Sequence, residues 1–171
     1  MLQSLLPSIF ILGLAALAAL ILARSRRSPA ENKSQRIAAS RALALATGVQ
    51  ALHFAEEAAT GFHERLGPVF GLPEMQFSYF MAFNLAWLGI WIVSVPGVRS
   101  AHTGALFAAW FLAIAGMFNG IGHPLLAAAA GGYFPGLVSS PFIAAASIWL
   151  WLRLRSATQP NGSRIESIHS E

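Results

Sequence analysis

Five long apolar runs dominate this chain and constrain its fold more than any other feature. They cover residues 2–23, 37–62, 76–95, 102–130 and 137–152. A helix needs about 20 apolar residues to cross a bilayer core of about 30 Å. The runs therefore predict an all-α, polytopic membrane bundle of about five transmembrane helices.

The composition agrees with a membrane protein and excludes several other classes. Hydrophobic residues make up 56% of the chain and charged residues 11%, whereas soluble domains carry about 25% charged residues. This leaves too little polar surface for an ordinary cytosolic enzyme and too much apolar surface for a disordered chain. Because the chain has no cysteine, disulfide scaffolds, zinc fingers and iron–sulfur centres are also excluded.

The positive charges mark the ends of the apolar runs. The formal net charge is +4. Most of the basic residues follow the first run or close the last one, namely Arg24, Arg26, Arg27, Lys33, Arg36, Arg153 and Arg155. Cytoplasmic flanks of spanning helices accumulate such residues. The pattern predicts an N-terminus outside, a cytoplasmic C-terminus, attraction to membrane lipids and no nucleic-acid partner.

Four segments follow from this topology. Residues 1–23 form an N-terminal anchor helix, and residues 24–36 form a basic cytoplasmic loop. Residues 37–152 form a four-helix membrane domain, and residues 153–171 form a polar cytoplasmic tail. Glycine and proline between positions 63 and 75 predict an external loop.

Polar side chains interrupt the second apolar run on one face. At about 100° per residue, Glu56 and Glu57 flank the direction of His53, and Gln50 and Thr60 fall in the same wedge. A charged side chain at mid-membrane costs at least about 2.5–3.5 kcal/mol. This cost favours a functional site over an accident of the surface.

The fourth run offers partners at a similar depth. Asn119 and His123 are four residues apart and share a face, and Gly116 and Gly120 lie close to that face. Paired small residues let another helix approach closely, whereas Pro124 is expected to weaken the helix near Gly120. On the third run, Asn84 is expected at mid-membrane.

These residue types suit a metal ion. Histidine and glutamate three or four apart on a helix can offer a nitrogen and an oxygen to one ion. The candidate ligands are His53, Glu56, Glu57 and His123, and the ion is a divalent metal, zinc or iron. The glutamate that does not bind would act as a general base or would orient a histidine.

The same residues also allow chemistry without a metal. A desolvated Glu56 or Glu57 could deliver a proton, with Asn84 and Asn119 holding the substrate by hydrogen bonds. Aromatic side chains around the site would suit a lipid-like or other apolar small molecule. A third possibility is a small transporter in which the carboxylates carry protons or a cation.

The string His53-Phe-Ala-Glu56-Glu57, followed by Asn119-Gly-Ile-Gly-His123, resembles the HXXEE family of small bacterial membrane proteins. The resemblance covers residues 37–152. It implies a multi-pass enzyme of the bacterial inner membrane that binds a metal.

A second resemblance is to the emopamil-binding (EXPERA) fold, a five-helix bundle that includes sterol isomerases. His53 with Glu57, and Asn84 with Trp87, could fill the roles of that site, but a separate glutamate from another helix is missing. This likeness implies the metal-free alternative. The sequence as a whole predicts a metal-dependent membrane enzyme acting on an apolar substrate.

Overall fold

The computed structural model describes residues 6–160 and is helical almost throughout. Six α-helices lie in this part of the chain: α1 (Leu6–Ser25), α2 (Lys33–Ala59), α3 (Phe62–Val69), α4 (Phe77–Arg99), α5 (Thr103–Ala129) and α6 (Ser140–Ala157). A short 3₁₀-helix, η2 (Ala30–Asn32), precedes α2. The predicted all-α class is confirmed. Residues 1–5 and most of the predicted tail, 161–171, lie outside the described residues.

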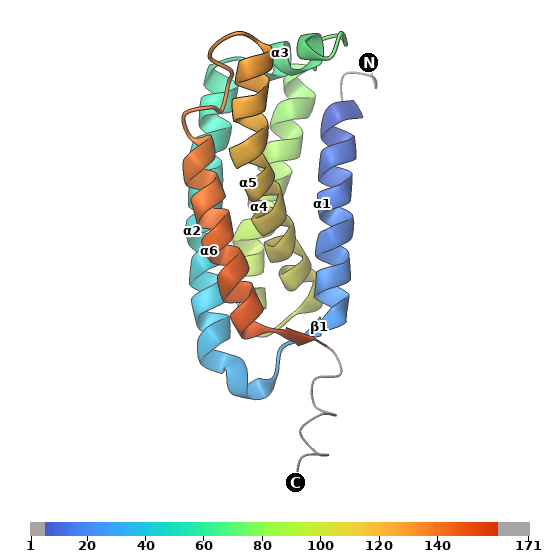
Figure 1. Cartoon of the computed structure of the whole chain (residues 1–171). Helices are drawn as coiled ribbons and strands as arrows, with labels where there is room; N and C mark the ends of the chain where they lie inside the picture. The colour runs from blue at the N-terminus through green and yellow to red at the C-terminus, as the bar shows by residue number, and fades with distance from the viewer. Residues whose placement is uncertain (1–5, 161–171) are drawn as a thin grey trace.

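Four long helices form a bundle, and α1 stands against its outside (Figure 1). The central helix is α5, which packs against α1, α4 and α6. Nearly every side chain from Ala105 to Gly116 is buried, because this helix is apolar all round and neighbours cover most of it. On α1, Ala15, Ala19 and Ala23 share one buried face at four-residue spacing.

Two short strands tie the ends of α1 and α6 together. Strand β1 (Arg26–Arg27) pairs antiparallel with β2 (Gln159–Pro160), with Arg26 opposite Pro160. In Figure 1 these strands lie at the end of the bundle opposite α3. The basic segment 24–36 is therefore not a plain loop, because it holds the end of α1, a strand, a 3₁₀ turn and the start of α2.

Two local expectations were wrong. Residues 63–75 were expected to be a loop, but α3 occupies Phe62–Val69. A side chain at Gly67 would overlap the Pro73 carbonyl, so this glycine serves a close chain contact inside a folded corner. Pro124 does not interrupt α5, which continues to Ala129.

Two helices, Phe77–Arg99 and Thr103–Ala129, are long and apolar enough to cross a membrane, and Ile9–Ser25 is a shorter apolar helix. The five-span topology stays a prediction. The close approach expected from the glycine pair is present: a Cβ on Gly116 would overlap Ser147, and one on Gly120 would overlap Ala144 of α6.

Gly120→Ala should lower the free energy of unfolding by about 1–2 kcal/mol, because overpacking against Ala144 exceeds the gain in helix propensity. Thermal unfolding in detergent, followed by circular dichroism, measures the change. Gly122→Ala is the matched control, since nothing lies within 4 Å of that position. Equal melting temperatures for the two variants would contradict the packing account.

Candidate metal centre

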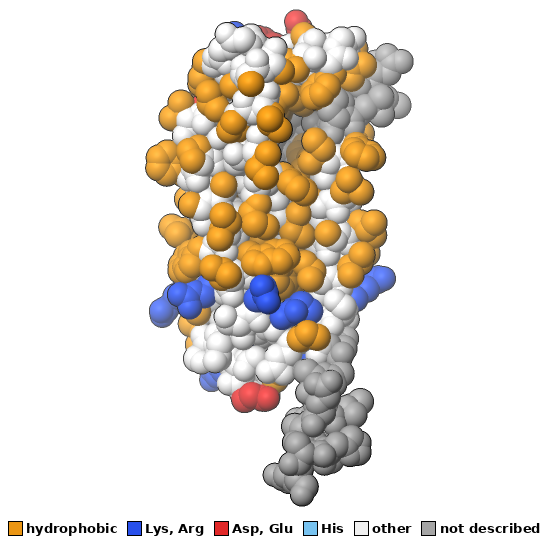
Figure 2. Space-filling view, in the orientation of Figure 1, with side chains coloured by type: hydrophobic (Ala, Val, Ile, Leu, Met, Phe, Trp, Pro, Cys, Tyr) orange, Lys and Arg blue, Asp and Glu red, His pale blue; other side chains and the backbone are white. Residues whose placement is uncertain are grey.

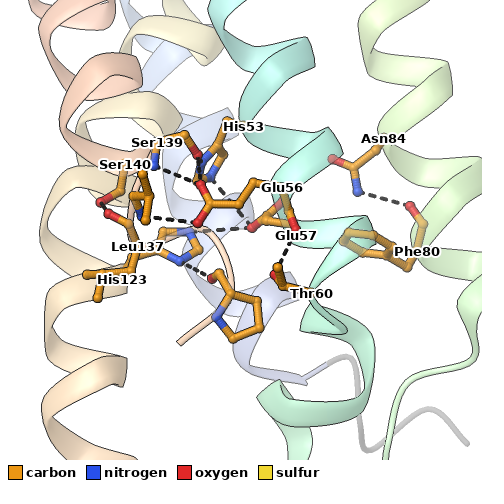
Figure 3. Close-up of polar contacts among 12 residues, drawn as sticks. His53, Glu56, Glu57, Thr60, Phe80, Asn84, His123, Leu137, Ser139 and Ser140 are labelled. Atoms are coloured by element: carbon orange, nitrogen blue, oxygen red, sulfur yellow. Dashed lines mark hydrogen bonds and ion pairs between the residues drawn. The ribbon is translucent and has the colours of Figure 1, made fainter. Parts of the chain in front are cut away.

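Three buried side chains, His53 and Glu57 of α2 and His123 of α5, converge at one level along the bundle (Figure 3). Twenty residues separate Lys33 from His53 on α2, and twenty separate Thr103 from His123 on α5. Both helices begin at the same end of the bundle. Arg99, just before the start of α5, shows this: its carbonyl accepts from Arg36 and its side chain donates to Ser40, both near the start of α2. At about 1.5 Å per residue, the two histidines therefore reach the same level.

The Glu57 carboxylate lies between the two imidazoles. Its Oε1 is 3.6 Å from His53 Nε2 and 3.4 Å from His123 Nε2. The two rings are perpendicular, with centroids 4.7 Å apart, and all three ligand atoms lie within 4.8 Å of one another. Two ligands bonded to tetrahedral zinc at about 2.0–2.1 Å lie about 3.4 Å apart, so these spacings suit a metal ion.

A backbone carbonyl fixes the orientation of His123. Its Nδ1 lies 2.7 Å from the Pro135 carbonyl oxygen, which can only accept a hydrogen bond, so Nδ1 carries a proton. Gly136 has φ +87° and presses on the same ring, leaving no room there for a Cβ. The other ring nitrogen, Nε2, faces the Glu57 carboxylate.

The Ser139 hydroxyl fixes the orientation of His53. Ser139 Oγ donates its proton to the Glu56 carboxylate and lies 2.7 Å from His53 Nδ1. A hydroxyl has one proton, so His53 Nδ1 donates to Ser139, and His53 Nε2 is the nitrogen that faces Glu57. This buried Nε2 has no hydrogen-bond partner among the described residues.

Glu56 binds the start of α6 and lies outside the three-residue group. Its carboxylate accepts hydrogen bonds from the Val138 and Ser139 N–H groups, at 3.1 and 2.7 Å, and from the Tyr133 hydroxyl at 2.8 Å. A carboxylate at a helix N-terminus is favoured by the helix dipole. Burial raises the pKa of the Tyr133 phenol, and the bond to Glu56 adds to that rise, so this donor keeps its proton at neutral pH.

The two asparagines do not join the cluster. Asn84 Nδ2 donates to the Phe80 carbonyl one turn earlier on α4, away from the histidines (Figure 3). Asn119 lies one turn before His123 and is partly buried, and within residues 6–160 its side chain makes no hydrogen bond.

Aromatic side chains surround the group. Phe62 lies 5.7 Å from the His123 ring and packs on Phe134, and Phe54 packs on Phe80. These rings belong to a second apolar cluster, separate from the main core. Phe62 and Phe134 therefore line one side of the His123 ring.

Sequence reasoning missed Ser139, Pro135 and Tyr133. The loop before α6 carried one readable signal, because Ser139-Ser140-Pro141 is typical of a helix start. That signal places the start of α6 at Ser140, but it does not show that Glu56 on another helix would bind there.

No protein-family model, curated protein or solved structure matches this chain. The resemblance to the HXXEE family therefore stays a prediction.

Glu56→Gln should lower the free energy of unfolding by about 1–2 kcal/mol, because an amide presents one acceptor oxygen where the carboxylate receives four donors. Thermal unfolding in detergent measures the loss. Glu74→Gln removes one negative charge from an exposed position and is the control. If both variants melt with the wild type, Glu56 does not stabilise the start of α6.

Proposed function

We propose that this protein is a membrane-embedded helical bundle that holds one divalent metal ion, zinc or iron, on His53, Glu57 and His123. We further propose that the centre belongs to an enzyme acting on a lipid-like or other apolar substrate. The observation that carries the proposal is the convergence of two imidazole nitrogens and a carboxylate oxygen, all buried, within 4.8 Å of one another. Such a group is costly to bury unless a cation is shared among its members.

The surface supports a membrane location. Hydrophobic side chains cover the middle of the molecule, and Lys and Arg gather in a band toward one end (Figure 2). Exposed apolar residues line the outer faces of α1 and α4, as at Phe10, Leu17, Ile92 and Val93. Soluble proteins rarely expose apolar surface so continuously. We place five spans in the bacterial inner membrane, with the basic end cytoplasmic.

The donor set fits a catalytic metal. Two histidines and one carboxylate leave a coordination position for water or substrate, as in open zinc sites. When bound, such an ion lowers the pKa of a bound water and polarises a substrate oxygen. His53 and His123 present Nε2, and their Nδ1–H groups are held by Ser139 and Pro135, which is the usual outer arrangement around a metal-binding histidine.

Other residues of the chain would orient the substrate and keep water out of the site. Phe54, Phe62 and Phe134 form apolar walls that suit a substrate with hydrocarbon character. Asn119, one turn before His123, is available to hydrogen-bond a polar group of that substrate. Glu56 would act through Ser139 as a positioning residue and not as a ligand.

The transporter alternative has less support. On the face of α2 below His53, the Thr47 hydroxyl donates to the Leu43 carbonyl and the Ser40 hydroxyl receives Arg99. Between them lie Leu43 and Ala46, both apolar and fully buried. A path for ions would need polar groups there.

Purified wild-type protein should contain one metal ion per chain by elemental analysis, whereas His53→Ala and His123→Ala should contain none, because two ligands cannot replace three in a buried site. His102→Ala removes an exposed histidine at the start of α5 and should keep the metal. Metal-free wild type would contradict the metal centre and favour acid–base chemistry.

Catalysis can be measured separately from metal binding. Metal-loaded protein in vesicles of bacterial lipid extract should convert a lipid into a new product, detected by mass spectrometry. His123→Ala in the same vesicles should not. Metal binding without any metal-dependent product would leave the centre standing but would refute this substrate class.

Ser139→Ala should weaken metal affinity by about 10–100-fold, because His53 loses the partner that fixes its proton on Nδ1. Competition with a chromophoric chelator measures the affinity. Ser139→Thr keeps the hydroxyl and should restore most of it. A Thr variant as weak as the Ala variant would show that the hydroxyl is not the reason.

A further inference from the structure

An apolar groove runs between α1 and α6, with α5 as its floor. Helix α1 sits on α5 through Ala15, Ala19 and Ala23, and α6 sits on it at Gly116 and Gly120. The space left between them measures about 440 Å³. Its walls include Ala18 and Leu22 of α1, Met117 and Phe118 of α5, and Trp151 of α6.

The cytoplasmic end of this groove is basic. Arg155 follows Trp151 by four residues and so lies on the same face of α6. Arg26, just past the end of α1, donates to the Thr158 carbonyl at 2.7 Å and to the Arg155 carbonyl at 3.3 Å. Burial and the positive charge of Arg155 lower the pKa of Arg26, and the Arg26 side chain lies against the Arg155 backbone.

No carboxylate balances these cations in residues 6–160. The acidic residues of that range are Glu31, Glu56, Glu57, Glu64 and Glu74, and only Glu31 lies at this end, where it is exposed. The ion pairs found in the described chain all involve histidine and lie at the other end. Among the described residues, therefore, Arg26 and Arg155 have no anionic partner, and an anionic ligand could supply one.

The size of the groove favours a hydrocarbon chain over a second protein helix. A helix with its side chains is about 10–12 Å across, so one turn alone would occupy roughly the whole 440 Å³. A single acyl chain is narrower and can follow a groove between two helices. A phosphate at its end would meet Arg155 and Arg26.

We infer that this groove binds an anionic phospholipid of the surrounding membrane, with one acyl chain against Trp151 and the phosphate at Arg155 and Arg26. The inference rests on the membrane location proposed above and not on the metal centre.

Tryptophan quenching tests the site directly. Full-length protein is placed in phosphatidylcholine vesicles containing phosphatidylglycerol, with bromine on the acyl chains of one lipid or the other. Brominated phosphatidylglycerol should quench more strongly than an equal amount of brominated phosphatidylcholine. Trp151→Phe should remove the difference, because Trp151 is the tryptophan in the groove.

Arg155→Gln should weaken the preference for phosphatidylglycerol by about fivefold, as expected for one lost cation near a phosphate. Its control is Arg153→Gln, which removes an arginine that lies over Trp149 on another face. Ala18→Phe should fill the groove and abolish the preference, whereas Leu17→Phe, on the exposed face of α1, should not. The two groove variants act independently, so misfolding of one, seen by circular dichroism, leaves the other as the test.

Equal quenching by both lipids, or equal effects of the Arg153 and Arg155 variants, would overturn the inference. If Trp151 became less quenched by brominated lipid as the protein concentration rose, the groove would bind a second copy of the chain instead of a lipid. Protein that fails to float with the vesicles would refute the membrane location as well, while elemental analysis of the metal would remain a separate result.

Discussion

The hydrogen bonds between Glu56 and the start of α6 hold the rest of the site in place. Through Ser139 they fix the proton of His53, and through residues 133–139 they hold the loop whose Pro135 carbonyl fixes His123. One carboxylate thus aligns two histidines that lie on different helices. Without it, the Ser139 hydroxyl would have no carboxylate to donate to, and the loop before α6 would lose its bonds at Tyr133, Val138 and Ser139.

The two adjacent glutamates have separate tasks because a helix turns by about 100° per residue. Glu57 follows His53 by four residues and so shares its buried face, whereas Glu56 is turned toward α6 and is only partly buried. Helical spacing predicted both as candidate ligands and did not choose between them. It could not separate their roles, because that depends on Ser139, which lies 83 residues further along the chain.

Most of the helical architecture was readable from the sequence, since long apolar runs and glycine pairs act locally. The helix over Phe62–Val69 was not, because Gly67 and Pro68 are typical of loops and the contact of Gly67 with Pro73 is tertiary. Asn84 was predicted to be a site residue, but its side chain donates to the Phe80 carbonyl of its own helix. Depth along a helix is a property of the sequence, whereas the direction of a side chain relative to its neighbours depends on packing.

The free-energy cost of burying the polar centre must be offset by close packing in the rest of the bundle. Two imidazoles and a carboxylate buried against one another oppose folding unless a cation is shared among them. Ala15, Ala19 and Ala23 on α1, and Gly116 and Gly120 on α5, let the helices approach closely and gain dispersion energy along their length. This packing fixes the backbones of α5 and α6 below the site, so the histidine and the serine reach it from rigid supports. A metal centre with few ligands requires such rigidity, because each ligand must already point at the ion before the ion arrives.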